Sequence, residues 1–276
     1  MNTKASFKKL PVEFFLLVFF LSIPFWLIGS MSQKGLPLPV NLPVSALSFI
    51  SPMIAALILV YKENKIAGIK QLLRKVFDYK KIERKTWYIP IIFLLPVTYL
   101  LSYGIMRLLG KPLPQEIQIP FSTLPLLFIG FFIPAVCEEL GWTGYAVDPM
   151  QNRLSTLKAG IILGAIWGIL HIIPDIQAHR NLTWIFWQRG VYSVALRVLI
   201  VWIYNNTGKS LFATSFFHDM DNVSWALFPN NGSHYDPEVT GIITASTMIS
   251  VVFLWGVKTL AKYRYASKYR YTSKYT

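Results

Sequence analysis

The chain has 276 residues, of which 54% are hydrophobic and 15% aromatic, whereas only 14% are charged. This composition lies outside the range of soluble globular domains and indicates a protein that has lipid as its solvent. The net charge of +14 comes from cations that gather in particular loops and tails, which argues against a nucleic-acid partner. The single cysteine, Cys137, excludes an intramolecular disulfide framework and a metal site built from several cysteines.

Long apolar runs are the main signal along the chain. A helix that crosses the bilayer needs about 20 mostly apolar residues, because irregular backbone cannot face hydrocarbon. The sequence therefore predicts an all-α fold, a polytopic transmembrane helical bundle of about eight membrane helices. The first run is too long for a signal peptide and lacks a small-residue cleavage site, so we expect it to stay as a helix. The runs lie near residues 12–29, 43–61, 87–109, 121–147, 157–174, 183–203, 209–228 and 239–260.

The charge distribution predicts the orientation and the domain organisation. Lys and Arg gather at the N-terminus, in segment 62–86 and in the tail, which all fall on one side of an eight-span bundle. The positive-inside rule then places both termini of a multi-pass cell-membrane protein in the cytoplasm. We expect a single transmembrane domain over residues 1–260, with its motif-bearing core at 121–228, and a basic, tyrosine-rich cytoplasmic tail at 261–276.

Two segments outside the spans are suited to the membrane surface. The tail alternates basic residues with tyrosine in a six-residue repeat, a pattern that favours contact with anionic lipid. Segment 62–86 spaces its apolar residues at helical intervals with cations between them, which predicts an interfacial amphipathic helix. Those apolar residues are Ile66, Ile69, Leu72, Leu73, Val76 and Phe77.

Ionisable side chains inside the spans are few, and each is a functional candidate because burying one costs several kcal/mol unless it is paired or hydrated. Glu138 and Glu139 lie in the fourth run, His171 ends the fifth, and His218 lies in the seventh. At about 1.5 Å per residue, Glu138 and His218 lie about 14 Å from the cytoplasmic ends of their helices and His171 about 21 Å, so the three can meet. Asn222 follows His218 by four residues and projects from the same helix face.

This polar set leaves several kinds of chemistry open. A carboxylate and two imidazoles in a dry bundle suit water activation or metal ligation. Any one of them alone is as well explained by a structural hydrogen bond between helices, but burying the whole set without a role would be costly. Intramembrane carboxylates also suit a proton-coupled transporter, although the chain lacks the repeated pair of broken helices seen in many transporters.

Three motifs in this region resemble those of the CPBP intramembrane proteases, which include the type II CAAX prenyl endopeptidases and the bacteriocin-immunity (Abi) proteins. The family motifs are a Glu-Glu pair separated from an Arg by three residues, an aromatic residue four before a His, and a His four before Asn or Asp. All three occur in the family's order within roughly 85 residues. The matching residues are Glu138-Glu139-Leu140-Gly141-Trp142-Thr143-Gly144-Tyr145, Trp167 with His171, and His218 with Asn222.

The resemblance implies an intramembrane endopeptidase that hydrolyses peptide bonds of membrane-associated peptides or proteins, prenylated ones among them. By this resemblance Glu138 and His171 would orient and deprotonate the attacking water, while His218 and Asn222 would stabilise the oxyanion. The implied partners are membrane lipid and a peptide or protein substrate. The cofactor stays open between no metal and a divalent metal such as zinc, held by Glu138, His171 and His218, since the HExxH spacing is absent.

The first motif departs from the family at Thr143. The family's Arg at this position lies four residues after the second glutamate and could pair with it, whereas Thr143 supplies no charge. Arg197 lies about 9 Å from the cytoplasmic end of its helix and Glu139 about 12 Å, so we predict an Arg197–Glu139 ion pair that supports the site. Without such a cation, an impaired enzyme or a non-catalytic immunity or scaffold protein of the same fold would be favoured.

Overall fold

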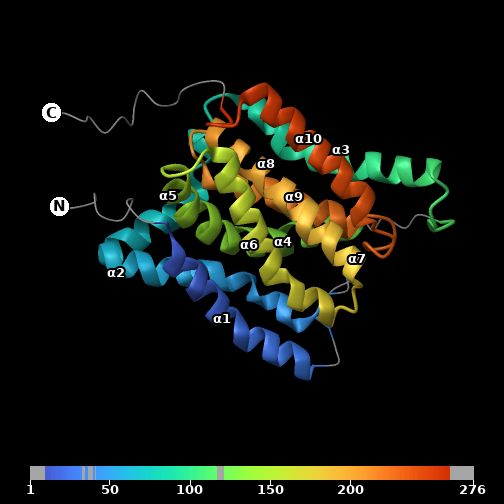
Figure 1. Ribbon diagram of the computed structural model, residues 1–276, viewed down its shortest axis with the longest axis horizontal. Coiled ribbons are helices and arrows are strands. Elements are labelled where there is room, and N and C mark those ends of the chain that lie inside the picture. The colour runs from blue at the N-terminus through green and yellow to red at the C-terminus, as the bar shows by residue number, and fades with distance from the viewer. Residues whose placement is uncertain (1–9, 33–34, 37–39, 41, 117–120, 262–276) are drawn as a thin grey trace.

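The computed structural model describes residues 10–32, 35–36, 40, 42–116 and 121–261, and within these ranges it contains helices and no strand. Helices α1 and α2 lie along one side of the bundle and α3 and α10 along the other, with α4, α6, α8 and α9 between them (Figure 1). The predicted all-α bundle is therefore confirmed. The α-helices are α1 (Val12–Met31), α2 (Ser51–Arg74), α3 (Tyr88–Leu108), α4 (Leu124–Gly141), α5 (Asp148–Gln151), α6 (Thr156–Gln177), α7 (Leu182–Ile185), α8 (Ser193–Asn206), α9 (Leu211–Leu227) and α10 (Pro237–Trp255).

Shorter helical segments of other geometry extend these helices. Two π-helices, η7 after α4 and η8 before α8, lie next to the residues that the sequence singles out, and π-helical turns often accompany functional sites. The 3-10 helices are η2 (Val44–Ile50), η3 (Lys75–Phe77), η4 (Tyr79–Lys81), η5 (Lys85–Trp87) and η6 (Phe121–Thr123), and the π-helices are η7 (Trp142–Val147) and η8 (Phe186–Tyr192).

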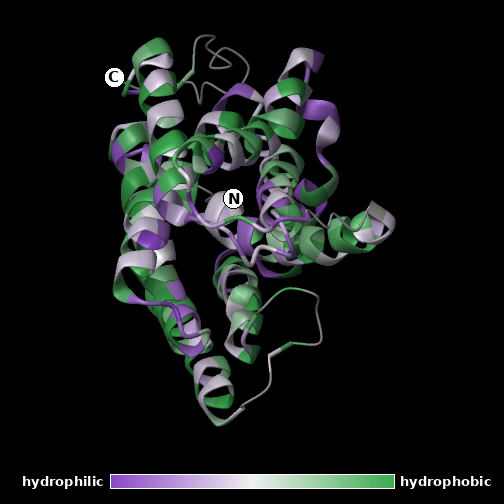
Figure 2. Ribbon diagram, turned by 90° about the vertical axis from the view of Figure 1, so that its right-hand side faces the viewer, coloured by the Kyte–Doolittle hydropathy of each residue, from purple (hydrophilic) through white to green (hydrophobic). Residues whose placement is uncertain are grey.

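Six helical segments among the described residues are long and apolar enough to cross a membrane. Large apolar side chains on them face outward, such as Leu100 with 70% and Phe253 with 87% of its surface exposed, and Figure 2 shows helices that are hydrophobic over much of their length. These outward faces are suited to lipid rather than water. The six segments are Val12–Met31, Val44–Phe77, Lys85–Leu108, Leu124–Gln151, Thr156–Gln177 and Pro237–Trp255.

The other two predicted spans, 183–203 and 209–228, are also helical but differ in character. The first is formed by α7, η8 and α8, and 12 of the 14 residues of α8 are buried. The second is α9, which is 17 residues long and carries His218 together with two aspartates. Because other helices surround these elements, their polar residues face protein and need not face hydrocarbon.

Glycines on α6 let it approach α8 and η8 closely. A Cβ atom at Gly164 would lie 2.7 Å from the Cα of Val194, and one at Gly168 would lie 2.7 Å from the backbone oxygen of Arg189. Small residues spaced four apart are a usual means of close helix packing in membranes. This packing brings the end of α6, which carries His171, against the elements that carry Arg189 and Arg197.

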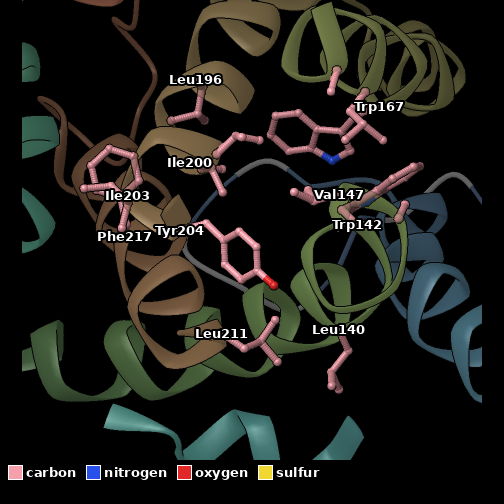
Figure 3. Close-up of a cluster of buried hydrophobic side chains, with 14 of the residues drawn as sticks. Leu140, Trp142, Val147, Trp167, Leu196, Ile200, Ile203, Tyr204, Leu211 and Phe217 are labelled. Atoms are coloured by element: carbon pink, nitrogen blue, oxygen red, sulfur yellow. The ribbon is translucent and has the colours of Figure 1, made fainter. Parts of the chain in front are cut away.

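The hydrophobic core lies beside the polar residues and is drawn in Figure 3. The part labelled there comes from α4, η7, α6, α8 and α9, and Trp142, Leu196 and Phe217 are at most 1% exposed. Trp167 is one of the residues of this cluster, so the core supports the site directly. The labelled members are Leu140, Trp142, Val147, Trp167, Leu196, Ile200, Ile203, Tyr204, Leu211 and Phe217.

The predicted amphipathic helix over 62–86 is shorter than expected. Helix α2 continues into this segment with a non-helical residue at Lys65 and ends at Arg74, and 3-10 helices follow. Asp78 accounts for the ending, since its Oδ1 accepts hydrogen bonds from Ser210 Oγ (2.7 Å) and from the backbone nitrogen of Phe212 (3.1 Å) and so ties the chain to the start of α9. Phe77 stays 75% exposed, as an interfacial residue would. The tail repeat, from residue 262 onward, lies outside the described residues.

Candidate active site

Glu138 and Glu139 follow the apolar part of α4 and are almost completely buried, at 6% and 0% exposure. Helix α4 is held against α2 here, since a Cβ atom at Gly141 would lie 2.5 Å from the backbone oxygen of Pro52. A buried carboxylate needs hydrogen-bond donors or cations around it. The two glutamates obtain them from different helices.

The carboxylate of Glu138 is the centre of the site. Its Oε1 accepts a hydrogen bond from Trp167 Nε1 (3.2 Å) and lies 3.6 Å from His171 Nε2, while its Oε2 lies 3.4 Å from His218 Nε2. The Trp167 ring packs edge-on against both imidazoles, with centroid distances of 5.3 and 5.4 Å. The structure thus brings together Glu138, His171 and His218 as the depth estimate predicted, with Trp167 between the histidines.

The hydrogen bonds of the two histidines decide which ring nitrogens carry protons. His171 Nδ1 lies 2.8 Å from the backbone oxygen of Trp167, which can only accept, so Nδ1 is protonated and Nε2 of the neutral ring is an acceptor. His218 Nδ1 lies 3.0 Å from Glu139 Oε1 and donates to this carboxylate. Both Nε2 atoms are therefore directed to Glu138, one of them as a proton acceptor.

Glu139 pairs with Arg197, as the sequence predicted. Arg197 Nη1 lies 2.7 and 2.9 Å from the two oxygens of Glu139, and neither side chain is exposed. Thr143 Oγ1 donates a further hydrogen bond to Oε2. The guanidinium carbon of Arg197 lies 4.6 Å from the centroid of the Trp167 ring, a cation–π contact. Arg197 on α8 thus supplies the positive charge that Thr143 cannot supply. Glu139 in turn orients the His218 ring through their hydrogen bond.

Asn222 lies one turn beyond His218 on α9 and is partly exposed. Within the described part of the chain its side-chain amide makes no hydrogen bond, so the amide oxygen and the amide nitrogen are both available to a ligand. His171, with 28% of its side chain exposed, is the most open of the three groups around Glu138. The site therefore packs against the core of Figure 3, and its most exposed member is His171 on α6.

A second polar cluster, which was not predicted from the sequence, lies beside the site. Asp221 Oδ1 accepts hydrogen bonds from Tyr99 Oη (3.1 Å) and from Tyr192 Oη. The two tyrosine oxygens lie 3.2 Å apart, and the Tyr235 ring stacks on Tyr99 at 5.7 Å. An acid within a predicted span, such as Asp221, is a functional candidate from the sequence alone, whereas a tyrosine in an apolar run is not. The cluster ties α3 and η8 to α9 between His218 and Asn222.

The metal hypothesis finds little support in the spacing of the ligands. Among the described residues, no group of three or more His, Cys, Asp or Glu side chains is spaced to hold a metal ion. The Nδ1 atoms of both histidines are engaged by Trp167 and Glu139, and the Nε2 atoms face Glu138 directly. A histidine whose Nδ1 donates to a carbonyl or carboxylate is also oriented as metal ligands usually are, so these contacts do not decide between a metal and none, and no step below uses a metal.

Comparison with known proteins gives the class of the site. Residues 120–224 match the family described as type II CAAX prenyl endopeptidase Rce1-like. The "CAAX prenyl protease 2" of Methanococcus maripaludis is 28% identical over 242 residues, which are 81% of this chain and 86% of that protein. This chain is an intramembrane endopeptidase similar to the CAAX prenyl proteases. The matched range contains all four residues proposed for catalysis, so the candidate site of the endopeptidase lies within the part of the chain that is similar to the family. The predicted resemblance is confirmed, and a non-catalytic protein is not favoured.

Proposed function

We propose that this endopeptidase hydrolyses peptide bonds of membrane-anchored peptides or proteins, prenylated CAAX-type substrates among them, using a water molecule activated by Glu138 and His171. The observation that carries the proposal is the convergence of His171 Nε2 and His218 Nε2 on the two oxygens of the Glu138 carboxylate. The relative from Methanococcus maripaludis is named for a CAAX prenyl substrate, which supports the choice of substrate class.

In the proposed mechanism a water molecule binds between Glu138 and His171. The carboxylate and the acceptor Nε2 are both bases, and a base that takes the proton during attack on the peptide carbonyl accelerates the reaction about 100- to 10,000-fold. The Trp167 hydrogen bond holds Glu138 in place for this step. Glu138 takes one proton from the water as the C–O bond forms and gives the same proton to the leaving nitrogen as the C–N bond breaks, so that the products are a carboxylic acid and an amine.

The oxyanion of the tetrahedral intermediate is stabilised by His218 and Asn222. A doubly protonated His218 donates from Nε2 to the oxyanion while Nδ1 still donates to Glu139. The Asn222 amide, one helical turn away, supplies the second donor. A pre-arranged donor of this kind contributes about 3–4 kcal/mol to the transition state. Glu139 and Arg197 act behind His218 and keep its ring oriented.

The test is cleavage by the detergent-purified protein of one peptide in two forms, farnesylated and unmodified at the same cysteine, followed by mass spectrometry. We expect the farnesylated form to be cleaved with the higher kcat/KM, because the lipid adds apolar binding surface. Activity that persists in a strong chelator would support the metal-free mechanism, and a loss that zinc restores would assign Glu138, His171 and His218 to a metal. Absence of cleavage of any membrane-anchored peptide by the folded protein would overturn the proposal.

We also infer that both termini face the cytoplasm and that anionic lipid contacts the basic segment 62–86. The exposed cations of this segment lie next to exposed Ile66 and Phe77, an arrangement that suits the negatively charged cytoplasmic leaflet. In a Cys137→Ser background, Leu182→Cys should react with an impermeant maleimide on intact cells, and Lys80→Cys only after the membrane is opened. The reverse pattern of labelling would reverse the orientation.

A further inference from the structure

Asp221 lies on α9 between the two residues proposed to stabilise the oxyanion, three residues after His218 and one before Asn222. Only 7% of its surface is exposed, and the proposed mechanism gives it no step. Its Oδ1 accepts hydrogen bonds from Tyr99 Oη on α3 (3.1 Å) and from Tyr192 Oη in η8. We call Asp221, Tyr99 and Tyr192 the tyrosine cluster.

The tyrosine cluster anchors α9 to two other elements. A buried carboxylate is costly without donors, and hydrogen bonds to a charged group are about twice as strong as those between neutral groups. Both tyrosines are themselves held in place, because the Tyr235 ring stacks on Tyr99 at 5.7 Å and Tyr192 is 1% exposed. Since the two donors come from α3 and η8, Asp221 keeps both hydrogen bonds at only one rotation of α9 about its axis.

The two oxyanion donors depend on this rotation to different degrees. His218 has a second restraint, because its Nδ1 lies 3.0 Å from Glu139 Oε1 on α4. The side-chain amide of Asn222 makes no hydrogen bond with a described residue, so its place follows the backbone of α9. Asn222 is therefore the donor that most needs an anchor elsewhere on the helix.

A small rotation of α9 is enough to displace the Asn222 donor. Successive residues of an α-helix lie about 100° apart, so Asp221 projects about 60° to one side of His218 and Asn222 about 40° to the other. A side-chain tip about 5–6 Å from the helix axis moves by about 2 Å when the helix turns by about 20°. A misplacement of about 1 Å can cost about 100-fold in rate.

We propose that Asp221, held by Tyr99 and Tyr192, is a positioning residue that fixes the rotation of α9 and so places the Asn222 amide at the oxyanion. This inference rests on the proposed function, because the oxyanion forms only in that reaction. Such a donor acts on the transition state, so loss of the tyrosine cluster lowers kcat and leaves KM nearly unchanged. The role needs the shape and the acceptor oxygen of Asp221, and it involves no proton transfer.

The first experiment compares two replacements of Asp221 in the cleavage of a farnesylated peptide. Leu has a similar size but no acceptor, so kcat should fall about 100-fold in Asp221→Leu while KM stays within about twofold of the wild type. Asn keeps an oxygen for both hydroxyls, so kcat of Asp221→Asn should stay within about threefold. Tyr192→Phe removes one of the two donors and should lower kcat about tenfold.

The matched control is Tyr103→Phe, which removes a tyrosine hydroxyl one turn further along α3. This hydroxyl lies 3.2 Å from Arg107 Nη1 and does not belong to the tyrosine cluster. We expect its kcat and KM to equal those of the wild type.

A double-mutant cycle tests whether Asp221 acts through Asn222. Asn222→Ala alone should lower kcat about 100- to 1000-fold. Adding Asp221→Leu should lower kcat by less than about a further threefold, because the donor that Asp221 places is already absent. If the leucine variant does not fold, as judged by its thermal melt, Tyr192→Phe takes its place in the cycle.

Three results would overturn the role of Asp221 while leaving the proposed function intact. They are equal losses of kcat from Asp221→Leu with and without Asn222, an Asp221→Asn protein as slow as Asp221→Leu, and wild-type kcat in Tyr192→Phe and Asp221→Leu. Cleavage of no membrane-anchored peptide by the folded wild-type protein would instead overturn the proposed function, and this inference with it.

Discussion

Replacing Glu138 by Gln is expected to lower kcat by about 100- to 10,000-fold while KM changes little. Gln has the same shape and still accepts the hydrogen bond from Trp167, but its amide cannot take a proton from water. The measurement is the initial rate of cleavage of a farnesylated peptide by the purified variant, with binding followed separately by displacement of a fluorescent peptide.

The matched control for this variant is Glu116→Gln, which removes an exposed carboxylate from the loop between α3 and α4. We expect its rate to equal that of the wild type. A Glu138→Gln protein that melts at the wild-type temperature and cleaves at more than about a tenth of the wild-type rate would remove Glu138 from the role of general base.

Replacing Arg197 by Met is expected to destabilise the protein by about 3–5 kcal/mol, because the buried carboxylate of Glu139 would lose its cation. The rate should fall as well, since Glu139 orients His218. Adding Thr143→Arg to this variant moves the cation to the position it has in the family motif, four residues after Glu139 and within reach of it. The double variant should therefore recover stability and activity relative to Arg197→Met alone.

These changes are measured as melting temperatures in detergent and as initial rates, with Arg153→Met as a control that removes an exposed arginine. An Arg197→Met protein with unchanged melting temperature would show that the ion pair does not stabilise the fold. A double variant with the same melting temperature and rate as Arg197→Met would show that Glu139 requires a guanidinium placed as that of Arg197 is, and that a positive charge nearby does not suffice.

The lengths of the apolar runs and the three motifs were local features, and for that reason the sequence by itself determined the helical membrane bundle and the class of protease. Depth counted along helices also placed Arg197 near Glu139, because the rise per residue is constant. The amphipathic segment was predicted too long, since its end depends on a contact between Asp78 and α9 that lies 132 residues away.

Only the tertiary structure decided how the helices are rotated against one another, and with this the direction of each functional side chain. It decided that His218 turns Nδ1 to Glu139 and Nε2 to Glu138. Helix rotation follows from the packing of glycines and core side chains between helices. The order of residues along one helix does not specify that packing, because the contacts belong to pairs of helices.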